Sequence, residues 1–238
     1  MKRQPLKGLL LFSLFDAKGH LVLASVLVSF IGILSLFAGT TPMSGFGTMI
    51  IFPTMSLLSH ASAAKSEKHK WSKFQLSMPI RRKDVITSRY LFYLFLTLIA
   101  LLATGLIEGI AYLLEFLDIA EVGRFSLGGI GPLVEIVEAF GVTSGQLSLN
   151  ILLVATGSAL LSCAIYYPLN YTICRGKEEL TAIMMLIGHL IITFFLMWLG
   201  GRMSLSLNQL VLLGIIAPTL LLVLSYFFTV KVYQNIDV

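Results

Sequence analysis

Residues 89–114 read RYLFYLFLTLIALLATGLIEGIAYLL, and this stretch decides the fold class. After Arg89 the run contains a single charged side chain, Glu108. An α-helix needs about twenty apolar residues to cross the ~30 Å hydrocarbon core of a bilayer. The stretch therefore predicts a transmembrane helix.

Comparable apolar runs occur on both sides of this segment. The 238-residue chain is 57% hydrophobic and 12% charged, with a mean hydropathy of +0.90, which is more apolar surface than one soluble core can bury. We therefore expect an all-α polytopic membrane protein, residues 1–238, that crosses the membrane six times as a single domain. The other five predicted spans are residues 21–38, 46–64, 149–172, 180–199 and 208–229.

The distribution of positive charge predicts the orientation, because Lys and Arg residues near span ends stay on the cytoplasmic side. With the N-terminus inside, fifteen of the seventeen Lys and Arg residues fall in cytoplasmic segments, and Arg124 and Arg202 lie outside. We therefore expect both termini to be cytoplasmic, in a multi-pass protein of the cell membrane, such as a bacterial plasma membrane. The first apolar run lacks a small-residue cleavage site, so a removable signal peptide is not expected.

Three connecting segments carry further predictions. Residues 5–20 are apolar with three charged side chains, which suits a helix lying in the membrane interface; a frayed extension of the first span is the alternative. Residues 65–88 form the predicted cytoplasmic loop. Residues 115–148 form an external loop, in which residues 132–140 have the pattern of a short amphipathic helix opened by a proline.

The chain lacks the phosphate-binding loop of an ATPase. That loop, GxxxxGK[ST], requires Ser or Thr after its lysine, whereas Gly176-Lys177 is followed by Glu178. We therefore expect neither ATP hydrolysis nor a bound cofactor on this chain. A metal site is not expected either, because the histidines are scattered along the sequence: His20, His60, His69 and His189.

One enzyme class offers a partial match. Glu178-Glu179 followed by His189 resembles the paired glutamates and histidine of the intramembrane proteases that process prenylated proteins. That family also requires an arginine shortly after the glutamates, and this chain has residues 180–183, LTAI, in that place. The glutamates are better explained as acids at the start of a helix, where they favour the helix dipole.

The cytoplasmic loop concentrates charge and aromatic residues. Eight of the seventeen Lys and Arg residues fall between Lys65 and Arg89. Lys68, Trp71 and Phe74 are spaced at i, i+3 and i+6, so a short helix would place two rings and a basic stem along one side. Such a surface predicts docking to a protein partner. Anchoring to anionic lipid head groups is the alternative.

Residues 65–90 resemble the intracellular loop of short six-span permeases of the type 2 ATP-binding cassette exporters. The resemblance departs mildly from the usual pattern at Met78, at Ile80-Arg81 and at Arg89. Over the rest of the chain, the resemblance rests on the number of predicted spans, the chain length and the interfacial helix predicted at residues 5–20. The matching residues are Glu67-Lys68, Trp71, Lys73-Phe74, Ser77-Met78-Pro79, Arg82-Lys83-Asp84-Val85-Ile86 and Arg89-Tyr90.

The resemblance implies a division of work between subunits. The loop would be a coupling helix that inserts into a cleft on a separate ATPase subunit. Two such ATPases, carrying ATP and Mg, would pair with two permeases, identical or paralogous. Membrane lipid is a further expected partner, and nucleic acid is not. The residues that the resemblance implies for docking are Glu67, Lys68, Trp71, Phe74, Pro79, Arg82, Lys83 and Asp84.

The substrate is less closely constrained than the class of protein. Within these permeases the chain most resembles exporters of phenol-soluble modulins, which are amphipathic peptides; antimicrobial peptides and hydrophobic drugs are further candidates. A non-transporting membrane anchor or sensor that recruits a cytoplasmic partner is the rival function.

Acidic residues predict a path for a cationic substrate. Glu108 lies within the apolar run and Glu115 follows nearly two turns later, on the same helix face. Residues 115–148 carry a net charge of −4. The alternative is that the external loop is acidic because positive charge is kept inside, and that Glu108 is protonated or bonded to a neighbouring helix.

Overall fold

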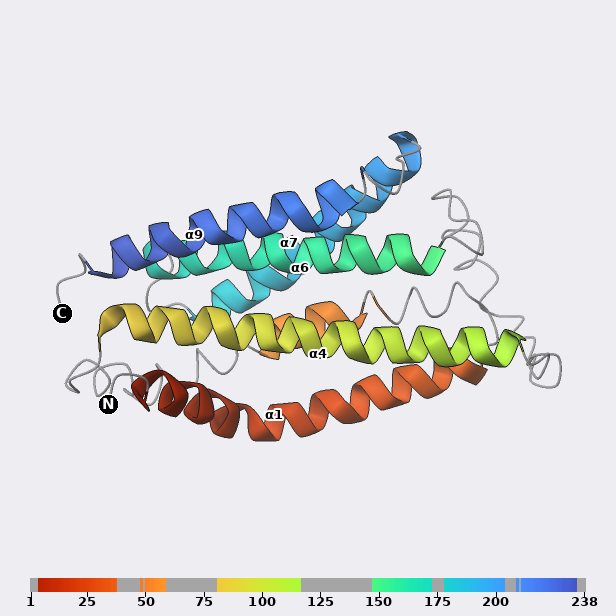
Figure 1. Ribbon diagram of the computed structural model, residues 1–238, viewed down its shortest axis with the longest axis horizontal. Helices are drawn as coiled ribbons and strands as arrows, with labels where there is room; N and C mark the ends of the chain where they lie inside the picture. Colours follow the sequence, from red (N-terminus) through yellow and green to blue (C-terminus); the bar gives the residue numbers. More distant parts are fainter. Residues whose placement is uncertain are drawn as a thin grey trace.

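The chain forms a bundle of long helices in a computed structural model (Figure 1), and no strand occurs among the residues that the structure describes. Those residues are 4–37, 48, 50–58, 81–116, 147–172, 178–203, 209 and 211–234. The helices are α1 (Gln4–Phe37), α4 (Arg82–Phe116), α6 (Leu147–Thr172), α7 (Glu178–Met203), the π-helix η2 (Leu212–Ile216) and α9 (Ala217–Gln234), with residues 50–58 also helical.

Three helices in the described part of the chain are long and apolar enough to cross a membrane. They cover Arg82–Ile107, Leu152–Thr172 and Leu212–Gln234, with mean hydropathies of 2.2, 1.6 and 2.1. The two halves of α1 make a fourth if they form one bent span, and the apolar part of α7, Ile183–Leu196, is shorter. The protein is therefore an all-α, polytopic membrane protein, as the sequence predicts. Helical residues occupy all six predicted span positions, and six crossings stay a prediction.

Helix α6 lies at the centre of the bundle, with α9, α7 and α4 packed around it, and α1 packs on α4 (Figure 1). In the span Leu152–Thr172, 72% of the residues are buried, against 22% in the span that contains α9. Small side chains make this position possible, because they let neighbouring helices approach closely. On α6 they include Ala155, Ser158, Ala159, Ser162, Cys163 and Ala164, all buried.

Helix α4 begins at Arg82, seven residues before the predicted span. The carbonyl of Arg81 accepts a hydrogen bond from the Asp84 backbone N–H at 2.8 Å, which closes the first turn. Asp84 is an acid in that turn, where it favours the positive end of the helix dipole. Arg82, Lys83 and Asp84 therefore form the first turn of a helix of 35 residues, so α4 extends from the predicted span into the predicted loop of residues 65–88.

Helix α1 bends within its first half. The segments Leu6–Phe15 and Ala17–Phe30 meet at 47°, so the change of direction comes earlier than the predicted boundary at residues 20 and 21. The helical hydrogen-bonding pattern nevertheless continues through the bend, because α1 runs unbroken from Gln4 to Phe37.

A π-helical turn precedes α9. The backbone N–H of Ala217 donates to the carbonyl of Leu212, five residues back, instead of four. Pro218 follows directly and has no N–H to offer the Gly214 carbonyl, which disfavours a regular α-turn here. At this turn η2 packs against α6, where Gly157 faces Gly214. The backbones meet there because neither residue carries a side chain.

Candidate functional site at the Arg82 end of the bundle

The predicted docking residues divide into two groups. Arg82, Lys83 and Asp84 form the first turn of α4, at the end of the bundle where α6 and α9 finish (Figure 1). This end is called the Arg82 end below. Lys83 is exposed, whereas Arg82 and Asp84 are half-buried. The other predicted docking residues lie outside the described residues: Glu67, Lys68, Trp71, Phe74 and Pro79.

Arg82 ties the start of α4 to the end of α9. Its Nη1 donates to the main-chain carbonyl of Gln234 at 3.1 Å. Carbonyls in the last turn of a helix have no intrahelical partner, so a guanidinium satisfies one of them and also complements the negative end of the helix dipole. The predicted docking turn is thereby joined to a helix far away in sequence.

Hydroxyl groups extend this connection between α4 and α9 deeper into the bundle. The Tyr90 hydroxyl lies 2.9 Å from both Ser225 Oγ and Thr229 Oγ1, and Thr87 Oγ1 lies 2.9 Å from the Tyr226 hydroxyl. Each such hydrogen bond contributes about 1 kcal/mol net.

Ser225 also brings α6 into the same group, because its hydroxyl donates to the Ala164 carbonyl at 2.7 Å. Thr229 donates to the Ser225 carbonyl at 2.8 Å. Since these two protons go to carbonyls, the single Tyr90 proton is the one available to the two hydroxyl oxygens, and they share it. One tyrosine thus joins α4 to a position where α6 and α9 are already bonded to each other.

Aromatic rings complete the contact with α6. The Tyr90 and Tyr167 rings are 4.6 Å apart between centroids, and the Tyr167 hydroxyl donates to the Arg89 carbonyl at 3.2 Å. The Arg89 guanidinium lies 5.6 Å from the centre of the Tyr171 ring, within range of a cation–π interaction. Tyr171 in turn meets Tyr233 of α9 at 5.1 Å.

Seven of the eight tyrosines of the chain belong to this region, which we call the tyrosine cluster. The rings and hydroxyls of the cluster join the start of α4 to the ends of α6 and α9. The members of the cluster are Tyr90, Tyr93, Tyr166, Tyr167, Tyr171, Tyr226 and Tyr233.

Tyr93 extends the cluster toward the middle of the bundle. Its buried hydroxyl donates to the Ala159 carbonyl of α6 at 2.7 Å and lies 3.0 Å from Ser56 Oγ. Ser56 also contacts Met185 Sδ of α7 at 3.8 Å. Four helical segments therefore meet around one phenol group.

His189 is a buried titratable side chain of α7. It is 1% exposed, and its two ring nitrogens lie 3.1 Å from Ser162 Oγ and 3.4 Å from Ser158 Oγ, both on α6. A polar side chain inside a membrane bundle is expensive unless it has such partners. This arrangement assigns His189 a packing contact with α6.

The protease resemblance finds no support in this geometry. Glu178-Glu179 and His189 stand on one helix, about 15 Å apart along its axis, so they do not converge on one ion. Among the described residues, no group of three His, Cys, Asp or Glu side chains could hold a metal ion. Glu108 and Glu115 both belong to α4, and the positions of their side chains lie outside what the structure describes.

The sequence reasoning missed the tyrosine cluster, although a signal for it was present. The predicted orientation places the start of the third span beside the ends of the fourth and sixth. In the sequence, seven of the eight tyrosines lie at or near those three span ends, and Tyr112 is the exception. Tyrosine suits a membrane boundary because its ring is apolar and its hydroxyl is polar.

A family model described as ABC-2 family transporter protein matches residues 9–137. The match covers more than half of the chain and includes α4, whose first turns form the site above. The chain is therefore a membrane subunit of an ATP-binding cassette transporter. It belongs to the ABC-2 family of transporter proteins, whose membrane subunits work with an ATPase partner. No curated protein and no solved structure matches it.

Proposed function

We propose that this ABC-2 subunit exports amphipathic or cationic peptides, or hydrophobic drugs, through the cell membrane. The energy comes from a separate ATPase that binds residues 65–90. The observation that carries the proposal is the attachment of the Arg82 turn to α6 and α9. A loop that receives force from an ATPase needs a stiff connection to the helices that move, and the tyrosine cluster supplies one directly after the loop.

In this proposal two ATPase copies, holding ATP and Mg between them, act on two permeases, identical or paralogous. The loop enters a cleft on the ATPase, and Trp71 and Phe74 are its anchors, since burying such rings at an interface can supply ~2 kcal/mol or more each. Arg82, Lys83 and Asp84 form the base of the coupling helix. The exposed Lys83 reaches the ATPase, while Arg82 holds α9.

Transport follows from rigid-body movement of the bundle. Closure of the ATPase pair on ATP displaces the loop, and the displacement passes from the Arg82 turn into α4. The hydrogen bonds of Tyr90 and the contacts of Arg89 then move α6 and α9 together with α4. Interfaces between packed helices shift as units, so a small displacement at one end opens or closes a path along the bundle.

The proposed substrate class rests on charge. The acidic loop of residues 115–148, with Glu108 and Glu115 leading to it, would attract a cationic peptide at the exit and repel an anionic one. Phenol-soluble modulins and other amphipathic peptides belong to the class of substrate that such a path would accept.

The docking step can be tested with two matched double variants. Trp71→Ala/Phe74→Ala should abolish co-purification of the ATPase encoded with this permease and should leave membrane insertion unchanged. Phe227→Ala/Phe228→Ala removes two adjacent rings from the exposed face of α9 and should leave co-purification intact. If the loop variant retains the ATPase, the loop anchors to lipid and the docking proposal is wrong.

The rival function, a membrane anchor or sensor, would also recruit a cytoplasmic partner through the loop. The two functions differ in what the partner does. An exporter in proteoliposomes should move peptide only with ATP and with the intact loop. A partner that binds normally, with no ATP-dependent movement of any peptide or drug, would favour the sensor.

A further inference from the structure

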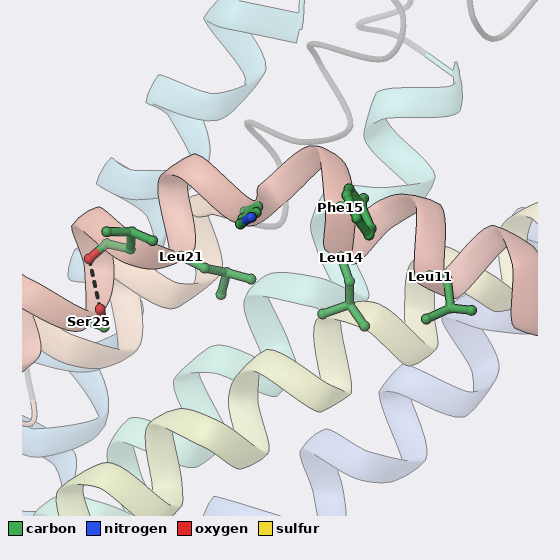
Figure 2. A pocket seen from close by; sticks show the side chains of 7 residues that line it. Leu11, Leu14, Phe15, Leu21 and Ser25 are labelled. Carbon is green, nitrogen blue, oxygen red and sulfur yellow. Dashed lines mark hydrogen bonds between the residues drawn. The ribbon is translucent and has the colours of Figure 1, made fainter.

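A shallow groove lies along α1 where the helix bends, and the proposed exporter function does not involve it. Seven residues of α1 line a shallow, open hollow of about 490 Å³. They recur at short intervals along α1 (Figure 2) and lie on both sides of the bend, where Leu6–Phe15 and Ala17–Phe30 meet at 47°. The lining residues are Leu11, Leu14, Phe15, Lys18, Leu21, Val22 and Ser25.

The lining combines an apolar surface with one cation. Five of the seven side chains are aliphatic or aromatic, and Lys18 supplies the only charge among them. The Ser25 hydroxyl donates to the Val22 carbonyl of its own helix at 2.8 Å (Figure 2), so its proton is already used. A ligand for this groove therefore needs a long apolar part and one anionic group.

We propose that the groove binds one anionic phospholipid. Its acyl chain lies along Leu11, Phe15 and Val22, which are 51%, 77% and 57% exposed. Its phosphate group contacts the Lys18 ammonium. Lysine commonly takes this role at a membrane surface, because its stem packs on apolar groups while its charge meets lipid phosphate.

Charge argues against the two other candidate occupants. A cationic peptide, the proposed substrate, would be repelled by Lys18. A second copy of the chain that packed its groove on this one through a two-fold axis would bring a second Lys18 toward the same apolar surface. An anionic lipid avoids both conflicts, and residues 5–20 are predicted to lie in the membrane interface, where lipid head groups are.

The test uses the full-length permease in vesicles of phosphatidylcholine and phosphatidylglycerol, with a photoreactive group on the acyl chain of one lipid at a time. Labelled peptides are identified by mass spectrometry. Phosphatidylglycerol should label residues 11–25 about fivefold more than phosphatidylcholine, the factor expected for one lysine near an anionic surface. Lys18→Gln should remove this preference, and Lys18→Arg should keep it.

Lys7→Gln is the matched control, because Lys7 is an exposed lysine on the same helix outside the groove. It should leave the preference unchanged. Equal labelling by the two lipids, or a preference that survives Lys18→Gln, would overturn the proposal. Crosslinks between two copies through residues 11–25 would overturn it as well and would identify a subunit interface. None of these outcomes bears on ATPase docking, so the exporter function is tested separately.

Discussion

Gly157 of α6 lies in direct backbone contact with Gly214 of η2: a Cβ atom added to Gly157 would come within 2.6 Å of the Gly214 carbonyl oxygen. A Cβ on Gly214 would in turn come within 2.9 Å of the Leu153 carbonyl oxygen. These atoms belong to the main chain of two packed helices and cannot rotate away. The crossing of α6 and the π-helical turn therefore requires glycine on both sides.

The first prediction follows from this crossing. Gly157→Ala should destabilise the bundle by ~1–3 kcal/mol, since overpacking forces two backbones apart. The buried thiol of Cys163 reports the opening of the bundle if Cys174 is first replaced by serine, so a fluorescent maleimide added during heating gives the midpoint. Gly105→Ala is the control, because nothing lies within 4 Å of the added Cβ. Equal midpoints for the two variants would contradict the contact.

The second prediction concerns the tyrosine cluster. Tyr90→Phe keeps the ring against Tyr167 and deletes the hydroxyl bonded to Ser225 and Thr229. We expect a loss of about 1 kcal/mol in stability. We also expect transport to fall by more than ATPase binding, because the ATPase still docks while its displacement reaches α9 less efficiently.

A matched variant separates coupling from stability. Thr104→Val removes a buried α4 hydroxyl whose hydrogen bonds, within the described part of the chain, go to carbonyls of its own helix. It should leave the ratio of transported peptide to hydrolysed ATP unchanged, whereas Tyr90→Phe should lower this ratio in proteoliposomes. If both variants lower it equally, the bonds of Tyr90 stabilise the bundle without transmitting movement.

The third prediction concerns His189 and its two serine partners. Each serine also donates to a carbonyl of α6, Ser158 to Ala155 at 2.8 Å and Ser162 to Ser158 at 2.7 Å, so neither loses its only bond if the histidine is removed. Removing the two serines and keeping the histidine should cost more stability. Ser158→Ala/Ser162→Ala takes both side-chain contacts from a buried imidazole, and we expect a loss of about 1–3 kcal/mol.

Adding His189→Leu to the double variant tests this explanation. It removes the imidazole, which the double variant leaves buried without its two serine contacts. The triple variant should therefore melt at a higher temperature than the double variant in the same maleimide assay. A triple variant less stable than the double would show that the imidazole has other partners that matter more than the serines.

The fourth prediction concerns orientation. Single cysteines introduced by Ser66→Cys and Ser126→Cys, in a background without Cys163 and Cys174, should react oppositely with a membrane-impermeant thiol reagent. Ser126→Cys should be labelled on intact cells, and Ser66→Cys only after the cells are opened. Labelling of Ser66→Cys from outside would reverse the orientation inferred from positive charge.

The elements that were predictable from the sequence are those set by local composition. The apolar run at residues 89–114 identified the core of α4, since a bilayer demands about that length. The extension of α4 back to Arg82 was not predictable in the same way, because hydropathy marks the part of a helix that crosses the membrane and not the charged turns before it. What decides there is the hydrogen bond from the Asp84 N–H to the Arg81 carbonyl, which no hydropathy pattern encodes.

Contacts between distant segments were much less predictable. Gly105 and Gly109 form a GxxxG pair in α4, a spacing that often permits close helix approach, but nothing in the described part of the chain lies within 4 Å of either added Cβ. The close approach occurs instead between Gly157 and Gly214, which are single glycines 57 residues apart. Sequence spacing along one helix says nothing about which glycine faces which neighbour.

The last prediction concerns the acidic path. A carboxylate within an apolar span costs a few kcal/mol unless it meets a cavity, a partner or a proton, so Glu108 is expected to have a function on α4. Glu115 stands seven residues further along the same helix, nearly two turns, and so on a similar face.

If these residues guide a cationic peptide toward the acidic loop, Glu108→Gln and Glu115→Gln should each reduce its export while expression and ATPase binding are preserved. Neutralising Glu135 and Glu138 should weaken the salt dependence of export, because exposed charges act over a Debye length of about 8 Å at physiological salt. An uncharged drug of similar size is the control substrate, and its export should not change in any of these variants. If none of the four substitutions and no change of salt alters export of the cationic peptide, the acidic-path hypothesis is wrong. The assignment to the ABC-2 family would be unaffected.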